Sequence, residues 1–170
     1  MWHRETGTDQ GATLVEYAVV APFLFLLLFG IVEFALLTAS FTGVWTSARE
    51  GARYATTVGD STVTPGTPRY LDCDGIRTSA RGLVAIGKPT NAQIAVDYFD
   101  PLGIQIADCD TADLAFPTPT ESTIHSGSTV TVTITKEYQT IAPLLGQLLD
   151  GITLDSTQRR SIHRGVVGGN

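Results

Sequence analysis

Ala18-Val-Val-Ala-Pro-Phe-Leu-Phe-Leu-Leu-Leu-Phe-Gly-Ile-Val32 is an apolar run that directly follows the junction Gln10-Gly-Ala-Thr-Leu-Val-Glu-Tyr17. No charged residue occurs between Glu16 and Glu33, and none occurs between Glu33 and Arg49. The apolar stretch therefore reaches the roughly 20 residues that a helix needs to cross the hydrocarbon core of a bilayer. We predict a transmembrane helix over residues 12–38.

A cleaved secretory signal is the alternative interpretation of this run. Such a signal has a basic leader, roughly 7–15 apolar residues and a small-residue cleavage site, for which Ala39-Ser40 is a weak candidate. Here the leader is nearly neutral, since the charge of Arg4 is offset by those of Glu5 and Asp9. The apolar run is also longer than the apolar part of a usual signal. Nothing else in the chain has the apolar bulk to enclose this helix in a soluble domain. The pattern favours the membrane span.

Length and charge limit the rest of the chain. The 170 residues leave room for one domain of roughly 100–120 residues beyond the span. A net charge of −6 and a pI near 4.9 argue against nucleic acid as a partner, because phosphate binding needs a basic face. The single basic cluster, Arg159-Arg160 with His163 and Arg164, is too short to change this expectation.

The sequence offers no set of residues for catalysis. His3, His125 and His163 are scattered, and no nucleophile elbow or glycine-rich phosphate loop is present. No residues can be assigned the roles of base, nucleophile and stabiliser. We expect neither an enzyme nor a bound cofactor.

The two cysteines, Cys73 and Cys109, lie in a Thr-rich, turn-rich region. An even number of cysteines in such a region favours a disulfide and an extracytoplasmic domain. Both are flanked by aspartates, so a metal site is the alternative, although the CxxC or HxxxH spacing of zinc sites is absent. The aspartates would equally solvate a bridge at the surface.

The basic residues near the ends of the span do not decide its orientation.

Residues 39–58 keep apolar positions at helical spacing, and so prolong the first helix until Gly59-Asp60. A second, shorter helix is expected over 75–86. Alternation predicts a hairpin of strands 93–99 and 104–107, joined by Asp100-Pro-Leu-Gly103. Further strands are expected over 129–135 and 152–162, with a short apolar helix or crossover over 142–149. These elements predict an α+β fold, in which the long amino-terminal helix packs on a small antiparallel sheet formed within residues 59–170.

The junction before the span has a chemical interpretation. Gly11 supplies an accessible, flexible bond for a peptidase at the membrane surface, and cleavage there would leave Ala12 as a new amine with Glu16 one helical turn later. A charge in the bilayer is costly, so pairing of Glu16 with the amine of a neighbouring subunit would lower that cost and fix the stagger between helices. The alternative is that Glu16 simply lies in the headgroup layer.

Glu33 is the other carboxylate of the hydrophobic region. It lies roughly 25 Å beyond Glu16 along a helix axis, and therefore near the opposite interface. Two roles fit this position: an interfacial carboxylate, or a contact with a neighbouring subunit.

Gly11-Ala-Thr-Leu-Val-Glu-Tyr17 resembles the type IV prepilin cleavage pattern, and its Glu-Tyr ending is the Flp (Tad) variety. Together with Pro22, Gly30-Ile-Val-Glu-Phe34 and Ala48-Arg-Glu-Gly-Ala-Arg-Tyr-Ala55, it is similar to the amino-terminal region of TadE-like proteins, the minor pseudopilins of that pilus system. The resemblance covers residues 4–58. Tyr17 stands where many members have Phe, and the resemblance does not separate TadE from TadF.

This resemblance implies residues with defined roles and a set of partners. Residues 1–11 would be a leader removed by a prepilin peptidase between Gly11 and Ala12, and Glu16, Tyr17 and Glu33 would serve recognition or assembly. The partners would be the peptidase, the major pilin, other pseudopilins, the assembly platform and membrane lipid. A pilin-like, single-pass protein of the cytoplasmic membrane is implied, with a cytoplasmic amino terminus and an extracytoplasmic domain, or a place in the pilus itself. The competing hypothesis is an extracytoplasmic binding or structural module on an uncleaved membrane tether.

Overall fold

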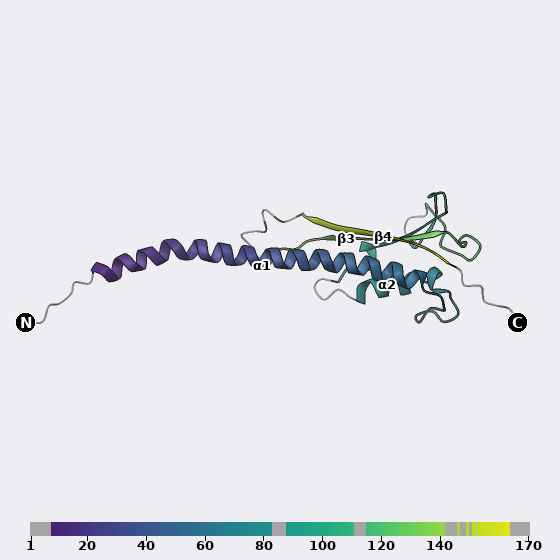
Figure 1. The fold of residues 1–170 in the computed structure, drawn as a ribbon, viewed down its shortest axis with the longest axis horizontal. Coiled ribbons are helices and arrows are strands. Elements are labelled where there is room, and N and C mark those ends of the chain that lie inside the picture. The colour runs from purple at the N-terminus through teal and green to yellow at the C-terminus, as the bar shows by residue number, and fades with distance from the viewer. Residues whose placement is uncertain are drawn as a thin grey trace, which may run out of the picture. The chain divides into compact units, whose positions relative to one another are not determined.

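The computed structural model describes residues 8–82, 88–110, 115–141, 146, 149 and 151–163 (Figure 1). The elements in chain order are α1 (Thr8–Thr56), η1 (Arg69–Leu71), α2 (Cys73–Gly82), η2 (Asn91–Gln93), β1 (Ile94–Phe99), β2 (Gln105–Asp108), β3 (Thr129–Glu137) and β4 (Thr153–Ser161). The structure combines a long apolar helix with a small antiparallel sheet, which confirms the predicted α+β class. The chain forms two compact units, residues 1–38 with 139–150 and residues 39–138 with 151–170.

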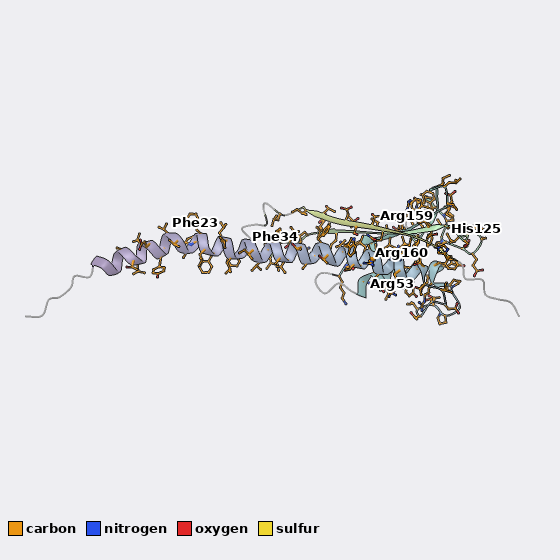
Figure 2. All side chains as sticks on the ribbon, viewed as in Figure 1. Phe23, Phe34, Arg53, His125, Arg159 and Arg160 are labelled. Carbon is orange, nitrogen blue, oxygen red and sulfur yellow. A yellow bond between two sulfur atoms is a disulfide. The ribbon has the colours of Figure 1, made fainter. Side chains whose placement is uncertain are left out.

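α1 is a single helix of 49 residues that contains Pro22. The predicted span and its predicted extension are thus parts of one continuous helix, which ends at Thr56 rather than at 58. Its most apolar window has a mean hydropathy of 2.5, and only 6% of that window is buried. Phe23 and Phe34 project from the helix and are 72% and 71% exposed (Figure 2). A helix this apolar on every side is long enough to cross a membrane, and lipid is the solvent that suits it.

The sheet of the second unit has the order β2-β1-β3-β4, and all of its pairs are antiparallel. All four predicted strands are present, and each begins and ends within two residues of its predicted bounds; the largest difference is at the end of β3, which runs on to Glu137. In the turn between β1 and β2, Asp100 Oδ1 accepts the backbone N–H groups of Leu102 and Ile104, at 2.9 and 2.8 Å. Gly103 closes this turn with a φ of 86°, a conformation that favours glycine.

Alternation along the strands builds the core of this unit. Every second residue of β1, and of β3 as far as Ile134, is buried: Ile94, Val96, Tyr98, Val130, Val132 and Ile134. On α1, residues at intervals of three or four are buried and form one face of the helix: Val44, Ala48, Ala52 and Ala55. Two residues of α2, Ile76 and Ala80, are buried as well. Each buried Val or Ile side chain contributes about 1.5–3 kcal/mol.

Gly51 lets the helices and the sheet approach closely. A Cβ at this position would lie 3.1 Å from Ala80 Cβ on α2 and 3.3 Å from Val132 Cγ1 on β3. With Ala48, Ala52 and Ala55 beside it, Gly51 makes this side of α1 a face of small residues. Close packing, rather than bulky side chains, therefore joins α1 to the rest of the unit.

α2 begins at Cys73, two residues before the predicted start. The predicted end of this helix, residues 83–86, lies outside the described residues. The predicted apolar element over 142–149 also lies outside them, apart from Gly146 and Leu149.

Candidate functional site

Gly11 and Ala12 lie near the start of α1, and every residue from Gly11 to Val20 is exposed. A Cβ added to Gly11 would meet no atom within 4 Å. Gly11, Ala12, Val15, Glu16, Val19 and Val20 lie together along one side of the helix here. Glu16 therefore shares a helix face with Ala12, four residues before it.

The Gly11–Ala12 bond is helical, whereas the sequence predicts a flexible bond. Helical conformation prevails because the apolar positions that follow continue the helix without a break. Glycine costs a helix about 1 kcal/mol relative to alanine, and helix ends fray. A peptidase that requires an extended substrate would have to unwind only these first turns.

Glu33 differs from its neighbours on α1. Its side chain is 2% exposed, while Val32 and Phe34 are 49% and 71% exposed. Its Oε1 accepts the backbone N–H of Ile141 at 3.3 Å, within the same compact unit. The carboxylate is therefore engaged by its own chain, a contact that neither role expected from the sequence includes.

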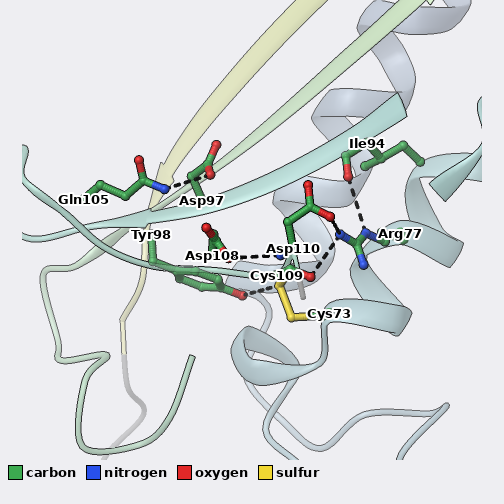
Figure 3. A network of polar contacts seen from close by, with 9 residues as sticks. All are labelled: Cys73, Arg77, Ile94, Asp97, Tyr98, Gln105, Asp108, Cys109 and Asp110. Carbon is green, nitrogen blue, oxygen red and sulfur yellow. Dashed lines mark hydrogen bonds and ion pairs between the residues drawn. A yellow bond between two sulfur atoms is a disulfide. The ribbon is translucent and has the colours of Figure 1, made fainter. Parts of the chain in front are cut away.

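The predicted disulfide between Cys73 and Cys109 is present, with a Cα–Cα distance of 5.6 Å (Figure 3). It joins the first residue of α2 to the residue after β2. Since both sulfurs are in the bridge, they are not metal ligands. Within the described residues, no group of three or more His, Cys, Asp or Glu side chains is placed to hold a metal ion.

The prediction that the flanking aspartates solvate the bridge is wrong for Asp72 and Asp108, which are 3% and 6% exposed. Asp108 Oδ1 accepts the backbone N–H of Asp110 at 3.1 Å, which closes a local turn. Asp74 is exposed, as expected. At Asp72 the error arises because α2 begins at Cys73, so that Asp72 takes the position that caps this helix.

Asp72 connects three parts of the unit. Its Oδ1 accepts the backbone N–H of Gly75 at 3.0 Å, the bond of a helix N-cap. Its Oδ2 accepts a hydrogen bond from the hydroxyl of Tyr54 on α1, at 3.0 Å, and another from the hydroxyl of Ser61 in the following loop. Ser61 Oγ in turn accepts the N–H of Thr64 at 2.7 Å. The carboxylate thus holds together the end of α1, the loop after it and the start of α2.

Arg77 links α2 to the sheet (Figure 3). Its Nε donates to the carbonyl of Ile94 at 3.3 Å, and its Nη2 donates to the carbonyl of Cys109 at 3.1 Å and to Asp110 at 3.4 Å. The hydroxyl of Tyr98 donates to the carbonyl of Tyr70 at 2.7 Å. Burial raises the pKa of Tyr98 above its usual value, so this hydroxyl stays neutral and remains a donor.

Asp97 lies on β1 opposite Asp108 and accepts a hydrogen bond from Gln105 Nε2 at 3.1 Å. Burial, and then the charges of Asp108 and Asp110, raise the pKa of Asp97. Between the unfolded-state pKa, about 3.9, and this raised value, the folded chain holds more protons than the unfolded chain. Stability therefore falls as pH rises through that window.

Asp97→Asn is expected to stabilise the protein at pH 7, because it removes the charge and keeps an acceptor for Gln105. The gain should stay below about 1 kcal/mol, since solvent screens a partly exposed group, and it should disappear below about pH 4. Urea unfolding of wild type and variant across this pH range measures the difference. A variant less stable than wild type at pH 7 would contradict the assigned cost of the charge.

The segment Ala48-Arg-Glu-Gly-Ala-Arg-Tyr-Ala55 divides its residues between two faces of α1. Ala48, Gly51, Ala52 and Ala55 lie on the buried face, and Tyr54 reaches Asp72. Glu50 and Arg53 form an ion pair on the outside, in which Arg53 Nε donates to Glu50 Oε2 at 2.8 Å. The sequence pattern on this part of α1 therefore follows from packing and capping.

One comparison with known proteins found a match, to part of α1. Residues 11–53 match the family model of the TadE-like proteins. No curated protein and no solved structure matches the chain. The matched segment begins at Gly11 and contains the junction, the apolar run and most of the small-residue face of α1. Over residues 11–53 the chain is therefore similar to the TadE-like proteins.

Proposed function

We propose that this chain is a minor pseudopilin that takes part in the assembly of a Flp (Tad) pilus after a prepilin peptidase has cut between Gly11 and Ala12. The observation that carries the proposal is the family match, which starts at Gly11 and leaves residues 1–10 outside. The exposed apolar helix that follows supports insertion into a membrane. The disulfide favours an extracytoplasmic location for residues 39–138 and 151–170, and hence a cytoplasmic leader.

Cleavage would change the electrostatics at the start of α1. The new amine of Ala12 would stand at the positive end of the helix dipole, where a positive charge is unfavourable. Glu16, about 6 Å further along the axis and on the same face, is exposed and available to a neighbouring subunit. Pairing of Glu16 with the Ala12 amine of a neighbour would offset both charges and set the stagger of adjacent helices.

Glu16→Gln is expected to separate assembly from processing. The amide keeps the size of the side chain and a hydrogen-bond acceptor but removes the charge, so insertion and cleavage should persist. Association with pilins or pseudopilins should weaken by about tenfold, which corresponds to about 1.4 kcal/mol. Crosslinking and co-purification from membranes measure the association, and the mass of the chain reports cleavage.

Glu50→Gln is the matched control, because it makes the same change on α1 beyond the apolar run, where Glu50 is partly buried and paired with Arg53 of its own chain. Association with partners should be unaffected in this variant. If the Glu16→Gln chain is cleaved and associates as well as wild type, Glu16 is only an interfacial residue. If the variant is not cleaved, Glu16 serves recognition by the peptidase instead.

A further inference from the structure

One face of α1 is covered inside the unit that contains the apolar run. Between residues 22 and 39, only four residues have reduced exposure: Gly30, Glu33, Leu36 and Leu37. Their spacing of three and four residues places them on one side of the helix. The same compact unit includes residues 139–150, the connection between β3 and β4. Part of this connection therefore lies against the membrane helix.

The contact between the two segments is polar at one point. The backbone N–H of Ile141 donates to Glu33 Oε1 at 3.3 Å, and Glu33 is 2% exposed. An unpaired N–H group and an unpaired carboxylate are both costly in or beside hydrocarbon. Each group thus provides the other with a hydrogen-bond partner at a place that the chain itself covers.

The side chain of Ile141 takes no part in this hydrogen bond and is 72% exposed. It belongs to a stretch, Ile141-Ala-Pro-Leu-Leu-Gly-Gln-Leu-Leu149, that carries no charge. Glu33 lies roughly 25 Å beyond Glu16 along the helix, and the hydrocarbon core is about 30 Å thick. With Glu16 at one boundary of the hydrocarbon core, these lengths place the backbone of Ile141 near the opposite boundary.

We propose that Glu33 fastens the β3–β4 connection to the membrane helix and that Ile141 contacts lipid there. The chain then has a second point of contact with the bilayer, continuous with the lipid-facing surface of α1. Glu33 is a positioning residue in this arrangement, and Ile141 is the residue that meets the lipid. The inference rests on membrane anchoring alone, and it is independent of cleavage at Gly11 and of pilus assembly.

An environment-sensitive fluorophore at residue 141 tests the proposal in the full chain. Because both native cysteines are in the disulfide, Ile141→Cys provides a single reactive thiol for an NBD label. In phosphatidylcholine–phosphatidylglycerol vesicles, we expect blue-shifted emission, quenching by lipids brominated near the headgroup and protection from aqueous iodide. The same label at Leu102→Cys is the control, because Leu102 is 85% exposed and lies in a turn of the other unit. It should be quenched by iodide and not by lipid.

Two changes at Glu33 test its role. Glu33→Leu removes the acceptor and makes the span more apolar, so the helix stays inserted while lipid quenching at residue 141 is lost. Glu33→Gln keeps an oxygen that accepts the Ile141 N–H, and should retain the quenching. A label at residue 141 that iodide reaches and lipid does not would overturn the proposed lipid contact. Unchanged lipid quenching in Glu33→Leu would overturn the fastening role of Glu33.

Discussion

Cys73→Ser is expected to lower the free energy of unfolding of the disulfide-containing unit by about 2–5 kcal/mol. The two cysteines are 36 residues apart in the sequence, and a bridge across a loop of this length removes about 3–4 kcal/mol of chain entropy from the unfolded state. The bridge also joins the start of α2 to the end of β2, next to the bond between Arg77 and the carbonyl of Cys109. Urea unfolding of the full chain in detergent, followed by tryptophan fluorescence, measures the loss.

Cys109→Ser and the double variant serve as controls for this effect. All three variants should have their free energy of unfolding lowered by the same amount, because each of them lacks the same disulfide. Wild type unfolded in the presence of a reductant should show that loss too, whereas the variants should not respond to it. Thiol labelling that finds both sulfurs free in normally exported protein would contradict the bridge.

Gly75→Ala is expected to destabilise the same unit by about 2–4 kcal/mol. A Cβ at this position would overlap Asp72 Oδ2 and stand 2.6 Å from the hydroxyl of Tyr54. The methyl group therefore displaces the Asp72 carboxylate from its bonds to the Gly75 N–H and to the two hydroxyls. The shift in urea midpoint of the full chain reports the cost.

Gly82→Ala is the matched control on the same helix, since its Cβ would meet no atom of the described structure within 4 Å. It should be neutral or stabilising by up to about 1 kcal/mol, because alanine favours the helix. In an Asp72→Ala background, Gly75→Ala should cost much less than it does in wild type, because the clash is already removed. Equal costs in both backgrounds would show that the clash with Asp72 is not the cause.

Much of the fold follows from local sequence pattern. The apolar run predicts the first helix because its length alone identifies a span, and alternation at Thr129–Thr135 predicts β3 because a strand exposes one face. The β1–β2 turn follows from Asp100-Pro-Leu-Gly103. The order β2-β1-β3-β4 does not follow from the sequence, since the pairing of β1 with β3 joins segments separated by a long connection.

The roles of individual carboxylates were harder to predict. Asp72 was expected at the surface, yet it is buried, because it caps a helix that starts two residues earlier than the apolar spacing suggests. Glu33 owes its burial to a unit that includes residues 139–150, and its partner Ile141 is 108 residues away in the sequence. No local pattern contains that contact. The family resemblance, by contrast, rests on local motifs, and the match over residues 11–53 confirms it.

The amino-terminal residue of the chain recovered from membranes or pili is the most direct test of the proposed function. Intact-mass analysis combined with amino-terminal sequencing identifies it, and a Gly11→Val variant provides the unprocessed reference. The proposed function predicts a mature chain that begins at Ala12, with residues 1–11 removed. An assembled chain that retains Met1 would contradict processing and favour the uncleaved membrane tether.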